Sequence, residues 1–162
     1  MPRMTQKQFK NLIKFWDDDE NESYSAYGHI NDWDTKYITN MDNLSILHPD
    51  FNQDISNWNV SNVTSMKNMF MNCNQFNQDI SNWDTSNVTD MQSMFQNCSQ
   101  FNQNLSKWDL SNVTSTKAMF SGCTIFNSEI NWRNTSKNQN MSNMFHSNLL
   151  FNKPIDNWNV SN

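Results

Sequence analysis

Three cysteines recur at one position of a repeating pattern, and thiolates are suited to metal binding or redox chemistry. They are Cys73, Cys98 and Cys123, each 25 residues from the last. A zinc site needs a fourth ligand and Cys-x-x-Cys spacing, and neither is present. An odd set of three also argues against a disulfide framework. Because their neighbours are Met and Phe, we expect buried, reduced thiols that act as small apolar side chains.

Carboxylates recur in two interrupted lines, and oxygen ligands of this kind suit calcium. Asp54 and Asp79 stand in one line, Asp84 and Asp109 stand in the other, and asparagine interrupts both. Calcium takes about six to eight oxygen ligands, and the glycine-rich turn of calcium-binding repeats is absent. We therefore expect a solvated acidic face, with no metal site and no cofactor.

Tryptophans form a further column, which includes Trp58, Trp83 and Trp108. Facing outward, they would make an aromatic strip able to stack on sugars or grip a protein. Facing inward, they would fill the core, and each indole N–H would need an acceptor. Inward or half-buried rings are favoured, because aromatic side chains are mostly buried. These three tryptophans and the four aspartates are the candidate binding face.

Composition and motifs exclude several classes of function. The 162-residue chain has a net charge of −5 and no cluster of Lys and Arg, which disfavours nucleic-acid binding. No apolar run approaches the roughly 18 residues that a membrane helix needs, so no membrane insertion is expected. No phosphate-binding glycine loop, nucleophile elbow or paired histidine is present. The sequence therefore predicts no catalytic residue and no enzyme.

The pattern returns every 25 residues, most clearly in the stretch from Phe76 to Cys98. A fixed period of about 20–50 residues indicates a solenoid, whose units bury their apolar faces against one another. Apolar side chains at equivalent positions should therefore meet in one core. The predicted core residues are Phe51, Phe76, Phe101, Phe126, Ile55, Ile80, Val63, Val88, Val113, Met66, Met91, Phe70, Phe95, Phe120, Cys73, Cys98 and Cys123.

Spacing within one repeat predicts the local structure. Apolar residues at i, i+3, i+4 and i+7 predict a short helix over Asp90–Cys98, capped by Thr89. A short strand is expected near Gln78–Asn82, followed by a tight polar corner. Asparagines that follow each Phe or precede each Val are expected to bond backbone groups of the next repeat. The sequence thus predicts an α/β repeat solenoid.

The chain divides into an N-terminal part and the repeats. Residues 1–25 contain an amphipathic capping helix, Thr5–Trp16, and an acidic connector. Residues 26–162 form about five rungs starting near 26, 51, 76, 101 and 126, plus a half rung from 151. Trp132 arrives one residue early, so we expect a distorted corner around Asn131–Asn138. The half rung exposes apolar surface, which would permit end-to-end self-association.

The repeat carries a family resemblance. Its pattern, F-N-x-x-I/L-x-x-W-D/N-x-S-N-V-T-x-M-x-x-M-F-x-x-C, resembles the repeat of the BspA-like surface proteins, first noticed in Mycoplasma lipoproteins of unknown function, over about Ile30–Asn162. The part from V-T to C also resembles the treponemal class of leucine-rich repeats. The resemblance implies a right-handed, leucine-rich-repeat-like solenoid with short parallel strands on one side and short helices on the other. It also implies use in adhesion, and it carries no catalytic residue.

These observations predict a noncatalytic module that binds an unidentified protein partner. The alternatives are a glycan-binding adhesin and a structural or virion spacer without a ligand. The N-terminus, MPRMTQKQFKNLIKFWDDDE, lacks the features of a secretory signal. A cytoplasmic or viral, host-cell location is therefore expected over the cell surface.

Overall fold

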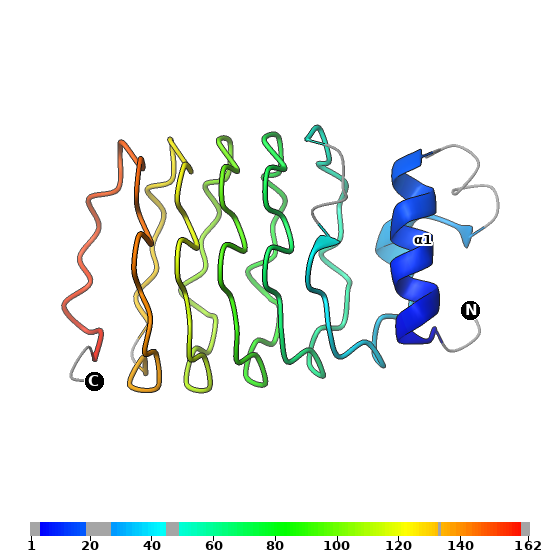
Figure 1. Cartoon of the computed structure of the whole chain (residues 1–162), viewed down its shortest axis with the longest axis horizontal. Coiled ribbons are helices and arrows are strands. Elements are labelled where there is room, and N and C mark those ends of the chain that lie inside the picture. Colours follow the sequence, from blue (N-terminus) through cyan, green and yellow to red (C-terminus); the bar gives the residue numbers. More distant parts are fainter. Residues whose placement is uncertain (1–3, 19–26, 45–48, 133, 160–162) are drawn as a thin grey trace.

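The computed structural model describes residues 4–18, 27–44, 49–132 and 134–159. The chain forms a row of stacked coils, one per repeat, and helix α1 (Gln6–Asp18) covers one end of the row (Figure 1). A single-turn 3-10 helix, η1 (Ile30–Asp32), opens the first coil. Within the described ranges, the β-pairing between neighbouring coils consists of isolated parallel bridges: Asn40–Ser65, Ser65–Asp90, Asp90–Ser115 and Ser115–Asn140.

Helix α1 corresponds to the amphipathic helix predicted at Thr5–Trp16. The Gln8 amide donates to Thr5 Oγ1 over 3.3 Å, and Gln8 Oε1 accepts from the Thr5 amide over 3.0 Å, which is a capping box. Phe9 and Ile13 are fully buried beneath the helix. Because two turns of apolar side chains pack on the first coil, α1 closes the core at this end. The acidic connector was predicted to begin at Asp17, but Asp17 and Asp18 still belong to α1, and residues 19–26 lie outside the described residues.

Gln6 closes the hydrogen-bonding edge at the same end. Its Nε2 donates to Asn40 O over 2.6 Å, and its Oε1 accepts from the amides of Thr39 and Asn40 over 3.1 Å each. One side-chain amide thus takes the place of a neighbouring coil, because it offers both a donor and an acceptor to the backbone.

The segment predicted as a short helix, Asp90–Cys98, is instead a ribbon of overlapping β-turns. The amides of Met94, Gln96 and Cys98 donate to carbonyls three residues earlier, over 3.2, 3.2 and 3.0 Å. Ser93 has a φ of 54° and Asn97 a φ of 63°, which an α-helix does not allow. Thr89, predicted as the helix cap, donates its Oγ1 to the Thr64 carbonyl instead.

The ribbon forms because its other amides are used between coils. The amides of Met91, Ser93, Phe95 and Asn97 donate to the next coil's Ser115, Lys117, Met119 and Ser121 carbonyls over 2.7–3.0 Å. An α-helix would use these amides within its own segment and leave the coils joined by side chains alone. The equivalent ribbons are 65–73, 90–98, 115–123 and 140–148.

The segment predicted as a strand, Gln78–Asn82, leads into a turn and forms no strand. The Trp83 amide donates to the Ile80 carbonyl over 3.2 Å, and the Gln78 side chain donates to the previous coil's Asn52 carbonyl over 2.8 Å. Polar side chains therefore supply contacts that a sheet would make with its backbone. The predicted right-handed, leucine-rich-repeat-like α/β solenoid, with strands on one side and helices on the other, is wrong for this chain.

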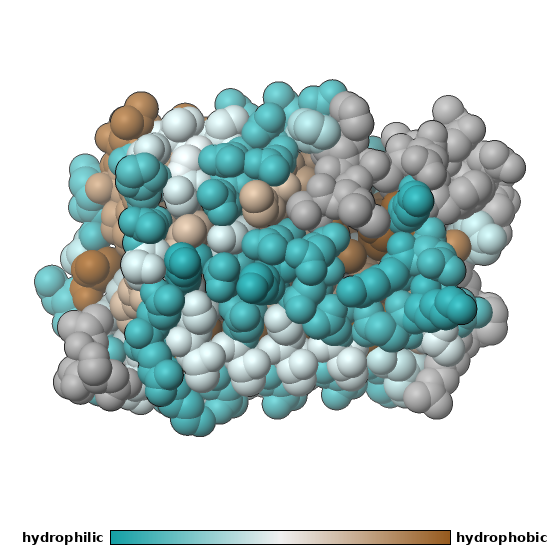
Figure 2. All heavy atoms as spheres, viewed as in Figure 1, coloured by the Kyte–Doolittle hydropathy of each residue, from teal (hydrophilic) through white to brown (hydrophobic). Residues whose placement is uncertain are grey.

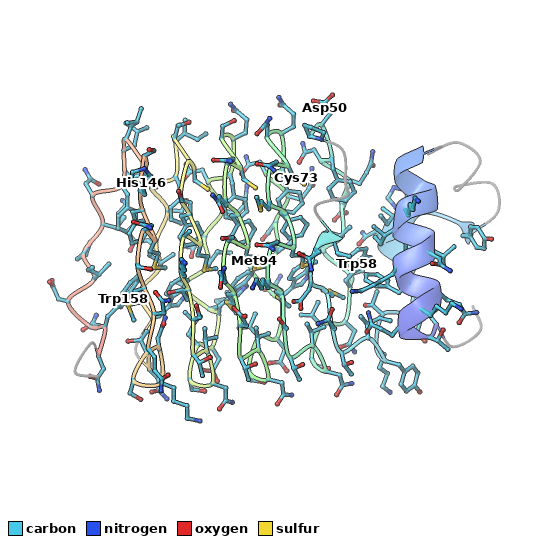
Figure 3. The ribbon with its side chains drawn as sticks, in the orientation of Figure 1. Asp50, Trp58, Cys73, Met94, His146 and Trp158 are labelled. Carbon is cyan, nitrogen blue, oxygen red and sulfur yellow. The ribbon has the colours of Figure 1, made fainter. Side chains whose placement is uncertain are left out.

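The core runs through the row of coils. Its aromatic rings stack in register, with centroids 5.6 Å apart for Phe70–Phe95, 5.7 Å for Phe95–Phe120 and 6.0 Å for Phe76–Phe101. The structure buries all the residues proposed for the core from the sequence, which are Phe51, Phe76, Phe101, Phe126, Ile55, Ile80, Val63, Val88, Val113, Met66, Met91, Phe70, Phe95, Phe120, Cys73, Cys98 and Cys123. Met94 and Cys73 lie inside the coils in Figure 3.

One buried column was missed in the sequence. It alternates between threonine and an aliphatic residue: Thr35, Val60, Thr85, Leu110 and Thr135. The Thr85 hydroxyl donates to the next coil's Asp109 carbonyl over 3.0 Å, which satisfies the buried oxygen. In the sequence, this column could have been found by its regular place two residues after Trp33, Trp58, Trp83 and Trp108.

The corner at Trp132 is shortened, as its early position in the repeat predicted. The Trp132 amide donates to Ile130 O, two residues back, over 2.7 Å, whereas the Trp108 amide donates to Leu105 O, three residues back. The indole still reaches the coil before it, because Trp132 Nε1 donates to Leu105 O over 2.8 Å. A surface hollow of about 290 Å³ lies beside this corner, between the coils of Trp108 and Trp132.

Candidate functional site

The four aspartates of the candidate face are exposed, and each accepts the amide two residues later. Asp79 Oδ1 accepts from the Ser81 amide over 2.9 Å, and Asp84 Oδ1 accepts from the Ser86 amide over 3.1 Å. Hydrogen bonds from the hydroxyl and then the amide of the following serine lower the pKa of both carboxyls. Asp54 and Asp109 close the same kind of turn, over 2.9 and 2.8 Å. The Asp79 and Asp84 side chains are therefore anionic at neutral pH.

The turn does not need the charge. Asn104 replaces aspartate in the line of Asp54 and Asp79, and its Oδ1 accepts from the Ser106 amide over 2.9 Å. Asn59 does the same for Ser61 over 3.1 Å in the other line. An amide oxygen caps the turn as a carboxylate does, since both accept an N–H. The charge is thus separable from the turn itself, although Asp54 Oδ2 also accepts from Asn31 Nδ2 of the previous coil over 2.9 Å.

The tryptophans do not join this face. Trp58 and Trp108 are each 3% exposed and Trp83 is 4% exposed, so they do not form an outward strip. The Nε1 groups of Trp58 and Trp108 donate to the Ile30 and Ile80 carbonyls over 2.8 and 3.0 Å. Among the described residues, Trp83 Nε1 has no hydrogen-bond acceptor. The structure therefore separates the seven proposed face residues into buried rings and exposed carboxylates.

The cysteine column is buried and reduced, as its apolar neighbours predicted. Cys98 Sγ donates to Phe70 O and Cys123 Sγ donates to Phe95 O, each over 2.9 Å. Burial raises the pKa of the Cys98 thiol well above its usual range and that of Cys123 to about 12. In the described part of the chain, no group of three or more His, Cys, Asp or Glu side chains is placed to hold a metal ion.

Asparagine ladders hold the flanks of the stack, which confirms the role predicted for them. The amides of Asn77, Asn102 and Asn127 donate to the preceding ladder asparagine's Oδ1 over 2.9, 2.9 and 2.8 Å. On the other column, the Nδ2 groups of Asn87 and Asn112 donate to the Ser61 and Ser86 carbonyls over 2.7 Å. These asparagine side chains thus hydrogen-bond to backbone groups of neighbouring coils.

The end of the stack opposite α1 is apolar. Hydrophobic residues gather there, whereas the flank that faces the viewer is mostly hydrophilic (Figure 2). Leu149 is 76% exposed, Leu150 53% and Ile155 42%. A hollow of about 430 Å³ lies at this end, lined by the sulfur, aromatic and aliphatic side chains of Met141, Met144, Phe145, Ile155 and Trp158, with Asn143 and His146. Trp158 and His146 mark this end in Figure 3.

The repeat architecture defines a protein of stacked 25-residue coils. Over residues 5–132 and 105–162, the chain matches the model of the family described as "Mycoplasma protein of unknown function, DUF285". The chain belongs to this family. Searches of curated proteins and of solved structures returned no match. No helix in the described ranges has both the length and the apolar character needed to cross a bilayer.

Proposed function

We propose that this protein is a noncatalytic module that binds another protein through the carboxylate lines of its coils. The observation that carries the proposal is the exposure of Asp54, Asp79, Asp84 and Asp109, on turns that asparagine closes with the same contact in other coils. Charge that folding does not require is available for recognition. Complementary charge speeds encounter and selects partners, so the partner is expected to carry basic side chains.

The burial of the reactive groups supports a role without catalysis. The three thiols are buried, and burial raises the pKa of Cys98 and Cys123, whereas the carboxylates stand on exposed turns. An acid or base that works at neutral pH needs a pKa near 7, which calls for burial of a carboxyl. The pKa values of Asp79 and Asp84 are instead lowered, which moves them further from 7.

Kinship with the BspA-like surface proteins is part of the same proposal. It rests on the repeat pattern of the sequence. The glycan-binding alternative has less support, because the rings of Trp58, Trp83 and Trp108 are covered and sugar recognition commonly uses an open aromatic face.

A charge-neutral variant tests the proposal. The change of all four aspartates to asparagine should leave the unfolding temperature close to wild type, since Asn59 and Asn104 already cap such turns. Cross-linking mass spectrometry in lysate should recover one or more basic proteins with the wild type. Recovery should fall by about tenfold with the variant, as expected for the loss of roughly 1.4 kcal/mol of binding free energy.

Other outcomes would select the alternatives. Equal recovery of the same partners by both proteins would contradict the carboxylate face. Binding on a glycan array that survives the four changes would favour the adhesin. No saturable binding to either class by the folded wild type would favour a spacer.

A further inference from the structure

A polar pair of side chains joins two neighbouring coils inside the apolar core. Asn138 donates from Nδ2 to Oγ1 of Thr116 in the coil before, over 2.8 Å, and both residues are buried. Asn138 Oδ1 accepts from the Asn140 amide over 3.2 Å, which distinguishes the oxygen of the side-chain amide from its nitrogen. The Thr116 hydroxyl donates in turn to Met144 Sδ over 3.6 Å. Each polar side-chain atom of the pair therefore has a partner within the stack.

The equivalent positions are apolar in the earlier coils. There, a buried methionine stands 22 residues before a buried valine, as Thr116 stands 22 residues before Asn138: Met41 and Val63, Met66 and Val88, Met91 and Val113. A polar residue on one side alone would leave a buried group without its partner, which is costly. The polar pair is therefore stable only when its two members face each other.

The other contacts between coils are alike from one interface to the next. Ribbon amides donate to the next ribbon at the same alternate positions, and the rings of Phe70, Phe95, Phe120 and Phe145 follow one another at 5.6–5.8 Å. Contacts of this kind do not distinguish one coil from another, in the same chain or in a second one. Misassembly is accordingly a characteristic failure of repeat proteins.

We propose that Thr116 and Asn138 fix the order of the coils, so that the coil of Asn138 stacks on the coil of Thr116 and on no other. On an earlier coil, Asn138 Nδ2 would face Met66 or Met91, and a thioether is only a weak acceptor. Under a different coil, Thr116 would face a valine such as Val88 and lose its donor. A single buried asparagine fixes the register of coiled coils for the same reason. The pair is independent of the carboxylate lines.

The double variant Thr116→Met, Asn138→Val tests the proposal, because it gives this place the residues of Met91 and Val113. The whole protein is unfolded in urea and refolded at high concentration. NMR then shows how many sets of signals the seven tryptophan indoles give, and sedimentation shows how many species are present. Wild type should give one set and one species. The double variant should fold but give additional sets or additional oligomers, and one set with one species would overturn the proposal.

The stability of the single variant shows whether the two residues act as a pair. Thr116→Met alone should lower the equilibrium constant for folding by about tenfold or more, because Asn138 Nδ2 is then buried without a strong acceptor. Addition of Asn138→Val should recover most of this loss. A double variant no more stable than Thr116→Met alone, in a urea titration, would contradict the pairing.

Thr85→Val is the matched control. Thr85 is also a buried threonine whose hydroxyl bonds to the next coil, and Val60 occupies the equivalent position. Its acceptor is a backbone carbonyl, which every coil carries, so the control should keep one set of indole signals even where it loses stability. Additional sets in the control would show that the loss of any buried hydrogen bond scrambles the stack, and would overturn the assignment to Thr116 and Asn138.

Discussion

Replacement of Gln6 by alanine should loosen the α1 end of the stack. Gln6 makes three hydrogen bonds to the first coil, over 2.6, 3.1 and 3.1 Å, from a partly buried position. Each such bond contributes about 0.5–1.5 kcal/mol net, and water can reach part of this edge. We therefore expect Gln6→Ala to lower the free energy of unfolding by about 1–3 kcal/mol, measured by urea titration. Hydrogen exchange at the Thr39 and Asn40 amides should accelerate more than exchange in the central ribbons.

Two further variants separate the amide from the rest of the side chain. Gln6→Met keeps the length of the side chain and removes its polar groups, so it should lose nearly as much stability as Gln6→Ala. Lys10→Ala, at an exposed position of the same helix, should change stability by less than about 0.5 kcal/mol. If Gln6→Met behaved like wild type, or if Gln6→Ala cost no more than Lys10→Ala, the amide would not be the cap inferred here.

Three other predictions concern the core and the flank. Phe95→Ala should lower the free energy of unfolding by about 3–5 kcal/mol, because a fully buried ring in the middle of the aromatic column is lost; a change under about 1 kcal/mol in a urea titration would show that the column does not carry the stack. Cys98 and Cys123 should resist a thiol reagent at pH 8 until urea unfolds the chain, since burial raises the pKa of both thiols, and fast labelling of the folded protein would contradict this. The stabilisation from Asp79 and Asp84 should be fully present above their ordinary pKa of 3.8 and lost as the pH falls through the lower pKa of the folded state. NMR titration of the two carboxyls checks the direction, and midpoints at or above 3.8 would refute it.

The period of the repeat was enough to predict which side chains share the core. Phe76 and Phe101 lie at the same position of adjacent units, and their rings stack 6.0 Å apart. The path of the backbone was not predictable from apolar spacing alone, because Met91, Met94 and Phe95 are buried equally well in a helix or in a ribbon of turns. The signal against a helix was in the polar residues: Asn97 occupies a position with positive φ, which asparagine tolerates better than most residues.

The candidate site was predictable only in part. The exposure of the aspartates follows from their place in polar turns, but the direction of the amide bonds between ribbons cannot be read from a sequence of side chains. The role of Gln6 was not predictable either, because in the sequence Gln6 is simply one of several polar residues of the amphipathic helix. Its role depends on a contact 34 residues away in the chain.

The direct amide bonds between ribbons also give the stack an electrical polarity. In each ribbon, the peptide units that join two coils have their C=O groups toward α1 and their N–H groups toward the opposite end. Each peptide carries a dipole of about 3.5 D, and dipoles aligned head to tail add together, as they do along a helix. The polarity here runs along the row of coils, across the direction of the chain, and each coil that is joined in this way extends it.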